Sequence, residues 1–225
     1  AALRPAAPDF RVYWDNAYAV HDLYDEGDEL LNIFDVLAGE GRDALVYEFA
    51  STSKVTFPGS GIAAVAASPA DIADLKGSFA VERVCPDKMS QLMHVRSFPD
   101  VDAVRAHMAR LAEVLRPRFE LVERRLSEGL GETGCATWTT PRGGYFVSFE
   151  GPEGSASRIV ELCRRTGVTL TGAGATWPGD DPRDSNIRIA PSYPMLEELD
   201  AALEVFCACA RLVSAQLAAE ARGLR

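Results

Sequence analysis

The sequence lacks the features of a nucleic-acid-binding, metal-binding or membrane protein. Its 225 residues carry a formal net charge of −10, whereas binding a phosphate backbone requires concentrated Lys and Arg. The five cysteines are an odd number without a CxxC pair or a His at ligand spacing, which indicates neither disulfides nor zinc. No apolar run reaches the roughly 20 residues of a membrane helix, and the N-terminus lacks the order of a signal peptide. We therefore expect a cytoplasmic protein without nucleic acid, metal or membrane partners.

The composition is that of a globular protein, with 47% hydrophobic and 25% charged residues. In the first hundred residues, strand-like and helical segments alternate, which is typical of an α/β architecture. We expect strands at residues 10–14, 44–49 and 62–67, and helices at 28–37 and 68–75.

A long amphipathic helix over about residues 101–126, with an expected kink at Pro117, joins this part to a second one. The second part has a different pattern, so we place a domain boundary near Phe98 and expect domains at 1–98 and 99–225. The expected elements are two strands within 136–149 around a turn at 141–144, short strands at 168–171 and 186–190, and helices at 155–165 and 195–219.

The segment Ser51-Thr52-Ser53-Lys54 places a lysine directly after an apolar run. A lysine at the end of a buried strand loses hydration, so its neutral amine becomes a usable nucleophile near physiological pH. The neighbouring hydroxyls and loop amides could bind a phosphate. Pyridoxal phosphate requires both an amine and a phosphate cradle. Taken alone, however, such a cluster is more typical of a solvated turn.

Pyridoxal chemistry also requires an anion at the pyridine nitrogen and a donor to the phenolic oxygen. Asp15, at an expected strand end, and Tyr18, one turn later, have the arrangement to supply them. Arg188, inside an apolar strand, is the arginine best suited to bind a substrate α-carboxylate. Simpler interpretations stay open, since Asp15 also fits a turn residue. Arg188 also fits an ion pair with Asp180, Asp181 or Asp184.

Two other motifs overlap this region. Residues 51–54 also match SxxK, which marks a serine nucleophile in penicillin-binding proteins, but the SDN and KTG strings of that site do not occur. Residues 59–64 match GxGxxA, but a dinucleotide site needs those glycines between a strand and a helix, and here a strand-like run follows them. Neither motif is supported by its expected context.

The order of these motifs resembles the class I/II pyridoxal-phosphate aminotransferases of fold type I. The resemblance lies in four ordered motifs: Asp15-Asn16-Ala17-Tyr18, Ser51-Thr52-Ser53-Lys54, Pro58-Gly59, and Arg188 with Ala190-Pro191-Ser192. Further segments, such as Pro141-Arg142-Gly143-Gly144-Tyr145-Phe146, resemble a bacterial subgroup of aspartate aminotransferases. The resemblance covers about the C-terminal half of such an enzyme. It implies an α/β fold: the end of the large domain, with a mixed sheet and flanking helices, followed by a small α+β domain.

The resemblance also implies roles. Lys54 would form the internal aldimine with pyridoxal phosphate and then shuttle a proton, Asp15 would pair with the pyridinium nitrogen, and Tyr18 would donate to the phenolic oxygen. Ser51 and Ser53 would bind the phosphate, and Arg188 the substrate α-carboxylate. The implied reaction is ping-pong amino transfer between an amino acid and a 2-oxo acid, with aspartate and 2-oxoglutarate favoured.

The chain departs from the family in two respects. Many members carry a phosphate-binding arginine after the Pro-Gly turn, where this chain has Ser60-Gly61-Ile62. The N-terminal half is also absent, so a complete site would need it from the same gene or a companion chain, within an expected homodimer. For a second substrate carboxylate, His21, Arg142 and Arg183 are the candidates. The alternative function is an aminotransferase-like interaction or regulatory module without catalysis.

Overall fold

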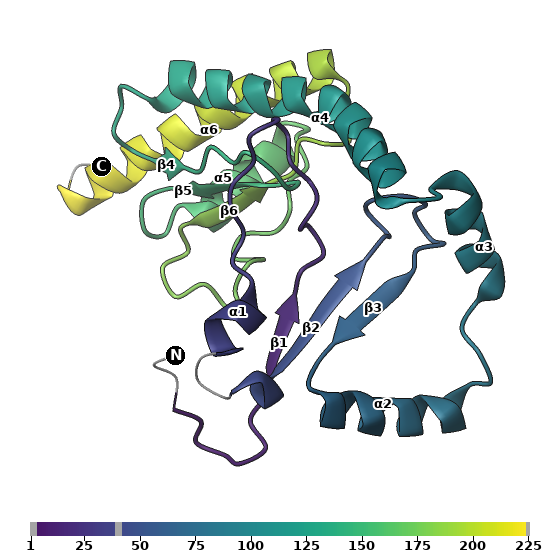
Figure 1. The fold of residues 1–225 in the computed structure, drawn as a ribbon. Helices are drawn as coiled ribbons and strands as arrows, with labels where there is room; N and C mark the ends of the chain where they lie inside the picture. Colours follow the sequence, from purple (N-terminus) through teal and green to yellow (C-terminus); the bar gives the residue numbers. More distant parts are fainter. Residues whose placement is uncertain (1–3, 39–41, 224–225) are drawn as a thin grey trace. The chain divides into compact units, whose positions relative to one another are not determined.

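The computed structural model describes residues 4–38 and 42–223, and these form two compact units. The first contains the described residues up to Asp22 together with Glu26–Ala109. The second contains Leu23–Asp25 and the described residues from Arg110 onward. Helix α4 (Val101–Leu130) contributes to both units (Figure 1). The functional division at residue 98 stays a prediction, and each unit is described by itself below.

The first unit is built on a three-stranded mixed sheet. Its strands are β1 (Val12–Asp15), β2 (Val46–Ser51) and β3 (Ala63–Ala66), in the order β1-β2-β3. β1 runs parallel to β2, and β3 runs antiparallel to it (Figure 1). This confirms the mixed sheet that the resemblance implies. The helical segments of this unit are α1 (Ile33–Ala38), a 3-10 turn (Asp43–Leu45), α2 (Pro69–Glu82), α3 (Lys88–Ser97) and the start of α4.

Side-chain caps explain where two of these helices begin. The Ser68 hydroxyl accepts from the Asp71 N–H and donates to the Asp71 carboxylate, which lowers the pKa of Asp71. Asp87 accepts from the N–H groups of Met89 and Ser90 and starts α3. The cap at Ser68 is as predicted, but α2 extends beyond its expected end at residue 75, and α3 was not predicted.

Two other expectations for the first unit are wrong. The helix expected at 28–37 forms only over α1. The strands are also less buried than expected: Tyr13 of β1 is 72% exposed and Phe49 of β2 is 36% exposed. The Tyr13 ring of β1 stacks on two rings of β2. Its centroid lies 5.8 Å from that of Tyr47 and 5.7 Å from that of Phe49, so the three rings partly cover one another.

The second unit is an antiparallel sheet packed against helices. Its strands follow the order β4-β5-β6, and the hairpin expected around residues 141–144 is confirmed. The segment 168–171 is not a strand, contrary to expectation. The elements are β4 (Thr137–Trp138), β5 (Val147–Glu150), α5 (Ala156–Arg165), β6 (Asn186–Ile189), α6 (Leu196–Ala221) and the larger part of α4.

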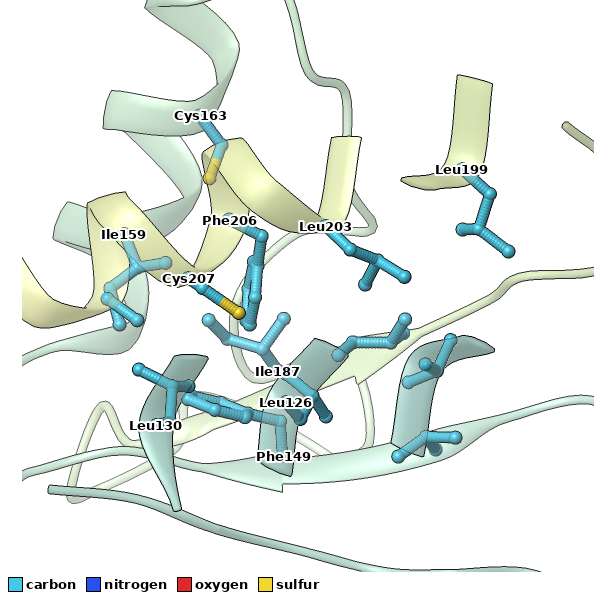
Figure 2. Packing of buried hydrophobic residues seen from close by; sticks show 14 of the residues in the cluster. Leu126, Leu130, Phe149, Ile159, Cys163, Ile187, Leu199, Leu203, Phe206 and Cys207 are labelled. Carbon is cyan, nitrogen blue, oxygen red and sulfur yellow. The ribbon is translucent and has the colours of Figure 1, made fainter. Parts of the chain in front are cut away.

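The core of the second unit lies between the sheet and the helices. Strand alternation directs Phe149, Ile187 and Ile189 inward, where they meet one face each of α4, α5 and α6 (Figure 2). Phe149 packs edge-on against Phe206 of α6, with ring centroids 5.0 Å apart. By length and composition α6 resembles a membrane span, which the sequence analysis did not expect, but it supplies seven buried residues of this unit.

Polar groups join the long helices of the second unit as well. The Arg125 guanidinium of α4 donates to both carboxylate oxygens of Asp200 of α6, with Nε and Oδ1 2.6 Å apart. Near them, Cys163, Cys207 and Cys209 are buried as thiols, and burial raises the pKa of Cys207 to about 11. The prediction that Cys207 and Cys209 are packing residues is therefore confirmed.

Candidate functional site

The expected site residues of the first unit gather at the carboxyl ends of two parallel strands. Asp15 is the last residue of β1 and is paired in register with Phe49 of β2. The Asn16 N–H donates to the Phe49 carbonyl (2.8 Å), so the chain leaving β1 stays beside β2. Lys54 follows the end of β2 by three residues. Ligands of open α/β sheets bind at this edge, because the chain leaves every parallel strand there.

A side chain interrupts the pairing of β2 with β3 and creates the turn that carries Lys54. The Thr52 N–H donates to the Ile62 carbonyl (2.8 Å), as the next rung of the ladder would. The Ile62 N–H, however, donates to Thr52 Oγ1 (2.8 Å) and not to the Thr52 carbonyl. That carbonyl accepts instead from the N–H groups of Val55 and Thr56 (both 2.9 Å). The chain therefore turns at Lys54 without leaving these backbone groups unpaired.

Lys54 and Tyr18 are brought together by this edge. The Lys54 ammonium lies over the Tyr18 ring, 5.9 Å from its centroid. Tyr18 in turn meets the His21 ring edge-on, with centroids 5.3 Å apart. The His21 Nε2–H donates to the Lys54 carbonyl (3.0 Å). The structure thus joins two site residues that lie 36 positions apart in the sequence.

His21 is a buried histidine, with only 3% of its surface exposed. Burial lowers its pKa from the usual 6.5, and the nearby positive charge of Lys54 contributes in the same direction. Its ring nitrogen faces the backbone of Lys54. We therefore assign His21 a structural position beneath the turn and not the binding of a second substrate carboxylate.

Ser51 and Ser53 place two hydroxyl groups beside the lysine. Their Oγ atoms are 2.8 Å apart, and the Ser53 N–H donates to Ser51 Oγ (3.1 Å). Gly61 makes this packing possible, because a Cβ at that position would lie 2.5 Å from Ser53 Oγ and 2.8 Å from the Ser53 nitrogen. Ser60, Gly61 and Ile62, which stand where the resemblance implies an arginine, offer no cationic side chain here.

The expectation that burial activates Lys54 is wrong for this chain. Lys54 is exposed, and so is Ala50 near the end of β2. The three-stranded sheet covers only part of its own surface, so the end of β2 keeps contact with water. The described residues of this unit therefore do not desolvate the amine.

Arg188 lies in the second unit, at the centre of β6. It pairs in register with Ser148 of β5, on the face opposite to the core residues Ile187 and Ile189. Its guanidinium carbon lies over the Phe146 ring, 4.4 Å from the centroid. Its Nε is buried and has no hydrogen-bond partner among the described residues. A buried donor without a partner is costly, and a bound carboxylate would satisfy it.

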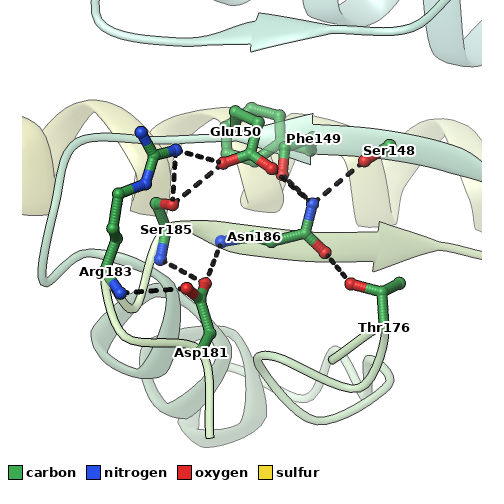
Figure 3. Close-up of polar contacts among 8 residues, drawn as sticks. All are labelled: Ser148, Phe149, Glu150, Thr176, Asp181, Arg183, Ser185 and Asn186. Atoms are coloured by element: carbon green, nitrogen blue, oxygen red, sulfur yellow. Dashed lines mark hydrogen bonds and ion pairs between the residues drawn. The ribbon is translucent and has the colours of Figure 1, made fainter. Parts of the chain in front are cut away.

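A polar network holds the start of β6 (Figure 3). The Asn186 side chain donates to Glu150 Oε1 (2.7 Å) and to Ser148 Oγ (3.0 Å), and accepts from the Thr176 hydroxyl (2.7 Å). The N–H groups of Ser185 and Asn186 donate to Asp181 (2.9 and 3.0 Å), and together with the Arg183 N–H they lower the pKa of Asp181. This network orients the strand that carries Arg188.

The same contacts decide between earlier alternatives. Among the described residues, Arg188 forms no ion pair with the three acidic side chains proposed for it. Asp184 accepts instead from the N–H and hydroxyl of Ser157, and caps α5. Arg183 donates to Glu150 (3.2 Å), and Arg142 lies over the Tyr24 ring, 5.3 Å from its centroid. Both arginines therefore have partners in their own unit.

The sequence analysis missed one buried residue of this region. His94 of α3 is 8% exposed, and its Nε2 lies 3.0 Å from Thr52 Oγ1 and 2.6 Å from Thr56 Oγ1. The sequence did not reveal this contact for two reasons. His94 lies far from the lysine turn in the sequence, and the helix that carries it, α3, was not predicted.

Comparisons with known proteins agree with this fold. The crystal structure of an aspartate transaminase from Corynebacterium glutamicum matches with a TM-score of 0.91 at 42% identity, over 96% of this chain and 51% of that one. LysN, an α-aminoadipate aminotransferase from Thermus thermophilus, matches with a TM-score of 0.74 at 19% identity, over 92% of this chain and 51% of that one, which supports the fold alone. The fold is therefore that of the fold type I aminotransferases.

Sequence comparison gives the family. The family model described as aspartate amino-transferase matches residues 1–222. An aspartate aminotransferase from C. glutamicum is 42% identical over 217 residues, which are 96% of this chain and 50% of that protein. An aminotransferase by name from Mycolicibacterium smegmatis is 43% identical over 212 residues, which are 94% of this chain and 50% of that protein. The chain belongs to the aspartate amino-transferase family and spans about half the length of these relatives.

We predict that Gly61→Ala destabilises the first unit. The added methyl group would overlap Ser53 and lower the free energy of unfolding by about 1–3 kcal/mol. The matched control is Gly77→Ala in α2, where a Cβ meets nothing within 4 Å. That control removes a helical glycine and should raise stability by up to about 1 kcal/mol. Equal stability of the two variants in denaturant unfolding would show that Gly61 is not constrained by Ser53.

We also predict a pH dependence that originates at His21. Because its pKa is lower in the folded than in the unfolded chain, the unfolded chain binds a proton first as the pH falls. The stabilising contribution is complete above pH 6.5 and is lost as the pH falls through the folded pKa. His21→Gln keeps a donor for the Lys54 carbonyl without this titration. Between pH 7 and 5, the variant should lose less unfolding free energy than the wild type, and an equal loss would contradict the assignment.

Proposed function

We propose that this chain supplies the lysine turn and the substrate arginine of a pyridoxal-phosphate-dependent aminotransferase. The observation that carries the proposal is the exposed Lys54 amine over Tyr18, at the carboxyl ends of β1 and β2. The reaction is transfer of an amino group from an amino acid, with aspartate favoured, to a 2-oxo acid, with 2-oxoglutarate favoured. The family membership and the names of the relatives support this choice.

The residues present fit the cofactor. Two serine hydroxyls 2.8 Å apart lie on the lysine turn, and the close approach of Gly61 leaves no room for a side chain beside them. Pyridoxal phosphate, when bound, supplies an aldehyde that reacts with amines and a ring that withdraws electrons from the substrate α-carbon.

Each residue of the chain then has a task. The Lys54 amine would hold the cofactor and move the proton that leaves the substrate α-carbon. The Asp15 carboxylate would keep a proton on the pyridine nitrogen, and the Tyr18 hydroxyl would donate to the phenolic oxygen. Ser51 and Ser53 would bind the phosphate.

Arg188 binds the substrate. Its guanidinium would bind the α-carboxylate with two parallel hydrogen bonds, and the carboxylate would provide the acceptor that the buried Nε needs. The Phe146 ring, whose centroid lies 4.4 Å from the guanidinium carbon, restricts the movement of this group.

The proposal extends to the partners of the chain. The relatives are twice as long, and Lys54 is exposed here, so we propose that the remaining half of the enzyme completes the site. It would come from the same gene or from a companion chain. We further propose a cytoplasmic homodimer, as the family resemblance implies.

The first test is the colour of the full-length protein. We expect a visible absorption band with added pyridoxal phosphate that shifts when an amino acid is added. Lys54→Ala should abolish this shift and lower turnover at least about a thousandfold. Lys76→Ala, which removes an exposed lysine of α2, should leave both unchanged. Turnover that persists in Lys54→Ala would contradict the mechanism, and a colourless wild type would favour the interaction module.

The second test concerns Arg188 and the substrate. Arg188→Lys keeps the charge but loses the planar fork, so KM for the amino donor should rise about tenfold or more. Arg164→Lys is the control, because Arg164 pairs with Glu161 within α5, outside the network that orients β6, and its KM should stay within about twofold. A panel of amino donors checks the substrate choice. Alanine activity without aspartate activity would overturn that choice, and an unchanged KM in Arg188→Lys would overturn the role of Arg188.

A further inference from the structure

His94 of α3 contacts both ends of the turn that carries Lys54. Its Nδ1 lies 2.7 Å from the Ser90 carbonyl, an acceptor only, so Nδ1 carries the hydrogen in this bond. In the neutral ring, Nε2 is then an acceptor. It lies within hydrogen-bond distance of the hydroxyls of Thr52 (3.0 Å) and Thr56 (2.6 Å), and its one lone pair accepts from one of them at a time.

These two threonines are the residues on which the turn is built. Thr52 Oγ1 accepts from the Ile62 N–H and so ties the turn to the start of β3. The Thr52 carbonyl accepts from the N–H of Thr56 (2.9 Å), and the Thr56 hydroxyl oxygen lies 3.1 Å from the same carbonyl. One imidazole nitrogen therefore faces the first and last residues of the sequence 52–56, which has Lys54 at its centre.

Aromatic contacts fix the ring that makes these bonds. Phe57 meets His94 edge-on, with centroids 5.3 Å apart, and Phe98 lies 5.7 Å from Phe57. His94 is 8% exposed, so few waters can replace its hydrogen bonds. The Lys54 side chain is exposed and contacts the Tyr18 ring, so packing contributes only part of what positions its amine. The position of its amine depends on the backbone of the turn.

We propose that His94 is a positioning residue for Lys54, a role that rests on the function proposed above. Its Nε2 accepts from one of the two threonine hydroxyls at a time, and through them it fixes the backbone from which the lysine projects. His21 holds the Lys54 carbonyl from the other side. Displacement of a reacting group by about 1 Å can cost about a hundredfold in rate, so loss of one anchor should be visible in turnover.

The test uses two substitutions that separate the nitrogens of His94. His94→Asn keeps a donor near the Nδ1 position but leaves nothing that reaches the threonines. His94→Gln places a carbonyl oxygen near the Nε2 position, where it can accept from them. In the full-length protein, His94→Asn should lower kcat about ten- to a hundredfold with KM changed less than about threefold, and His94→Gln should restore most of kcat.

A second readout does not depend on turnover. These 225 residues contain three lysines, Lys54, Lys76 and Lys88, whose peptides can be followed separately in the full-length protein. Limiting pyridoxal phosphate followed by borohydride reduction modifies amines, and peptide masses give the rate at each lysine. His94→Asn should slow modification of Lys54 about tenfold, with Lys76 and Lys88 as unchanged internal references. His107→Gln removes a histidine that stacks on Phe98 (5.1 Å) outside the turn, and should change neither readout.

A pair of variants at Thr56 covers the case in which His94→Asn does not fold. Thr56→Val removes the hydroxyl that lies 2.6 Å from His94 and should reproduce the slower modification of Lys54. Thr56→Ser keeps the hydroxyl and should recover the rate. A folded His94→Asn, or Thr56→Val in its place, that modifies Lys54 at the wild-type rate would overturn the role of His94. A wild type modified no faster at Lys54 than at Lys76 would instead contradict the proposed function.

Discussion

The structure of the candidate site depends on one exchange of hydrogen-bond acceptors at the end of β2. The Ile62 N–H donates to the side-chain oxygen of Thr52 and not to the Thr52 carbonyl. This keeps the rung of the ladder and frees the carbonyl to begin a turn through Val55 and Thr56. Without that exchange, the strand would either continue past Lys54 or leave a backbone donor unpaired. Lys54 projects from the sheet edge because the Thr52 hydroxyl replaces the Thr52 carbonyl as the acceptor for the Ile62 N–H.

Much of the fold could be predicted from periodicity and caps. The strands of both sheets, the long helices α4 and α6, and the cap at Ser68 all follow from local patterns. Helix α3 does not, because it has no clear apolar stripe: His94 is buried, whereas Met89 and Val95 are exposed. Its inward face holds a hydrogen-bonded histidine, which a hydrophobic pattern cannot reveal. The short strand expected at 168–171 is absent for the opposite reason, since an apolar run need not find a partner strand.

For the candidate site residues, the sequence predicted their proximity better than their exposure to solvent. The proximity of Tyr18 and Lys54 follows from two parallel strands ending at one edge, which the order of motifs implied. The exposure of Lys54 could not be foreseen, because burial depends on what covers the sheet and not on the strand itself. For Arg188, the sequence could not decide between substrate binding and an ion pair with Asp180, Asp181 or Asp184. The structure gives two of the three proposed acids other partners, since Asp181 accepts from three backbone N–H groups and Asp184 caps α5.

Hydrogen exchange at the Ile62 amide tests this arrangement most directly. In the 225-residue chain, the Ile62 N–H should exchange slowly because Thr52 Oγ1 accepts it. Thr52→Ser keeps the oxygen and should preserve the protection, whereas Thr52→Val removes it and should expose the amides of both Ile62 and Thr56. If the Ile62 amide exchanges at the rate of an unstructured peptide, or if Thr52→Val leaves it protected, the side chain does not build the turn and the positioning of Lys54 needs another explanation.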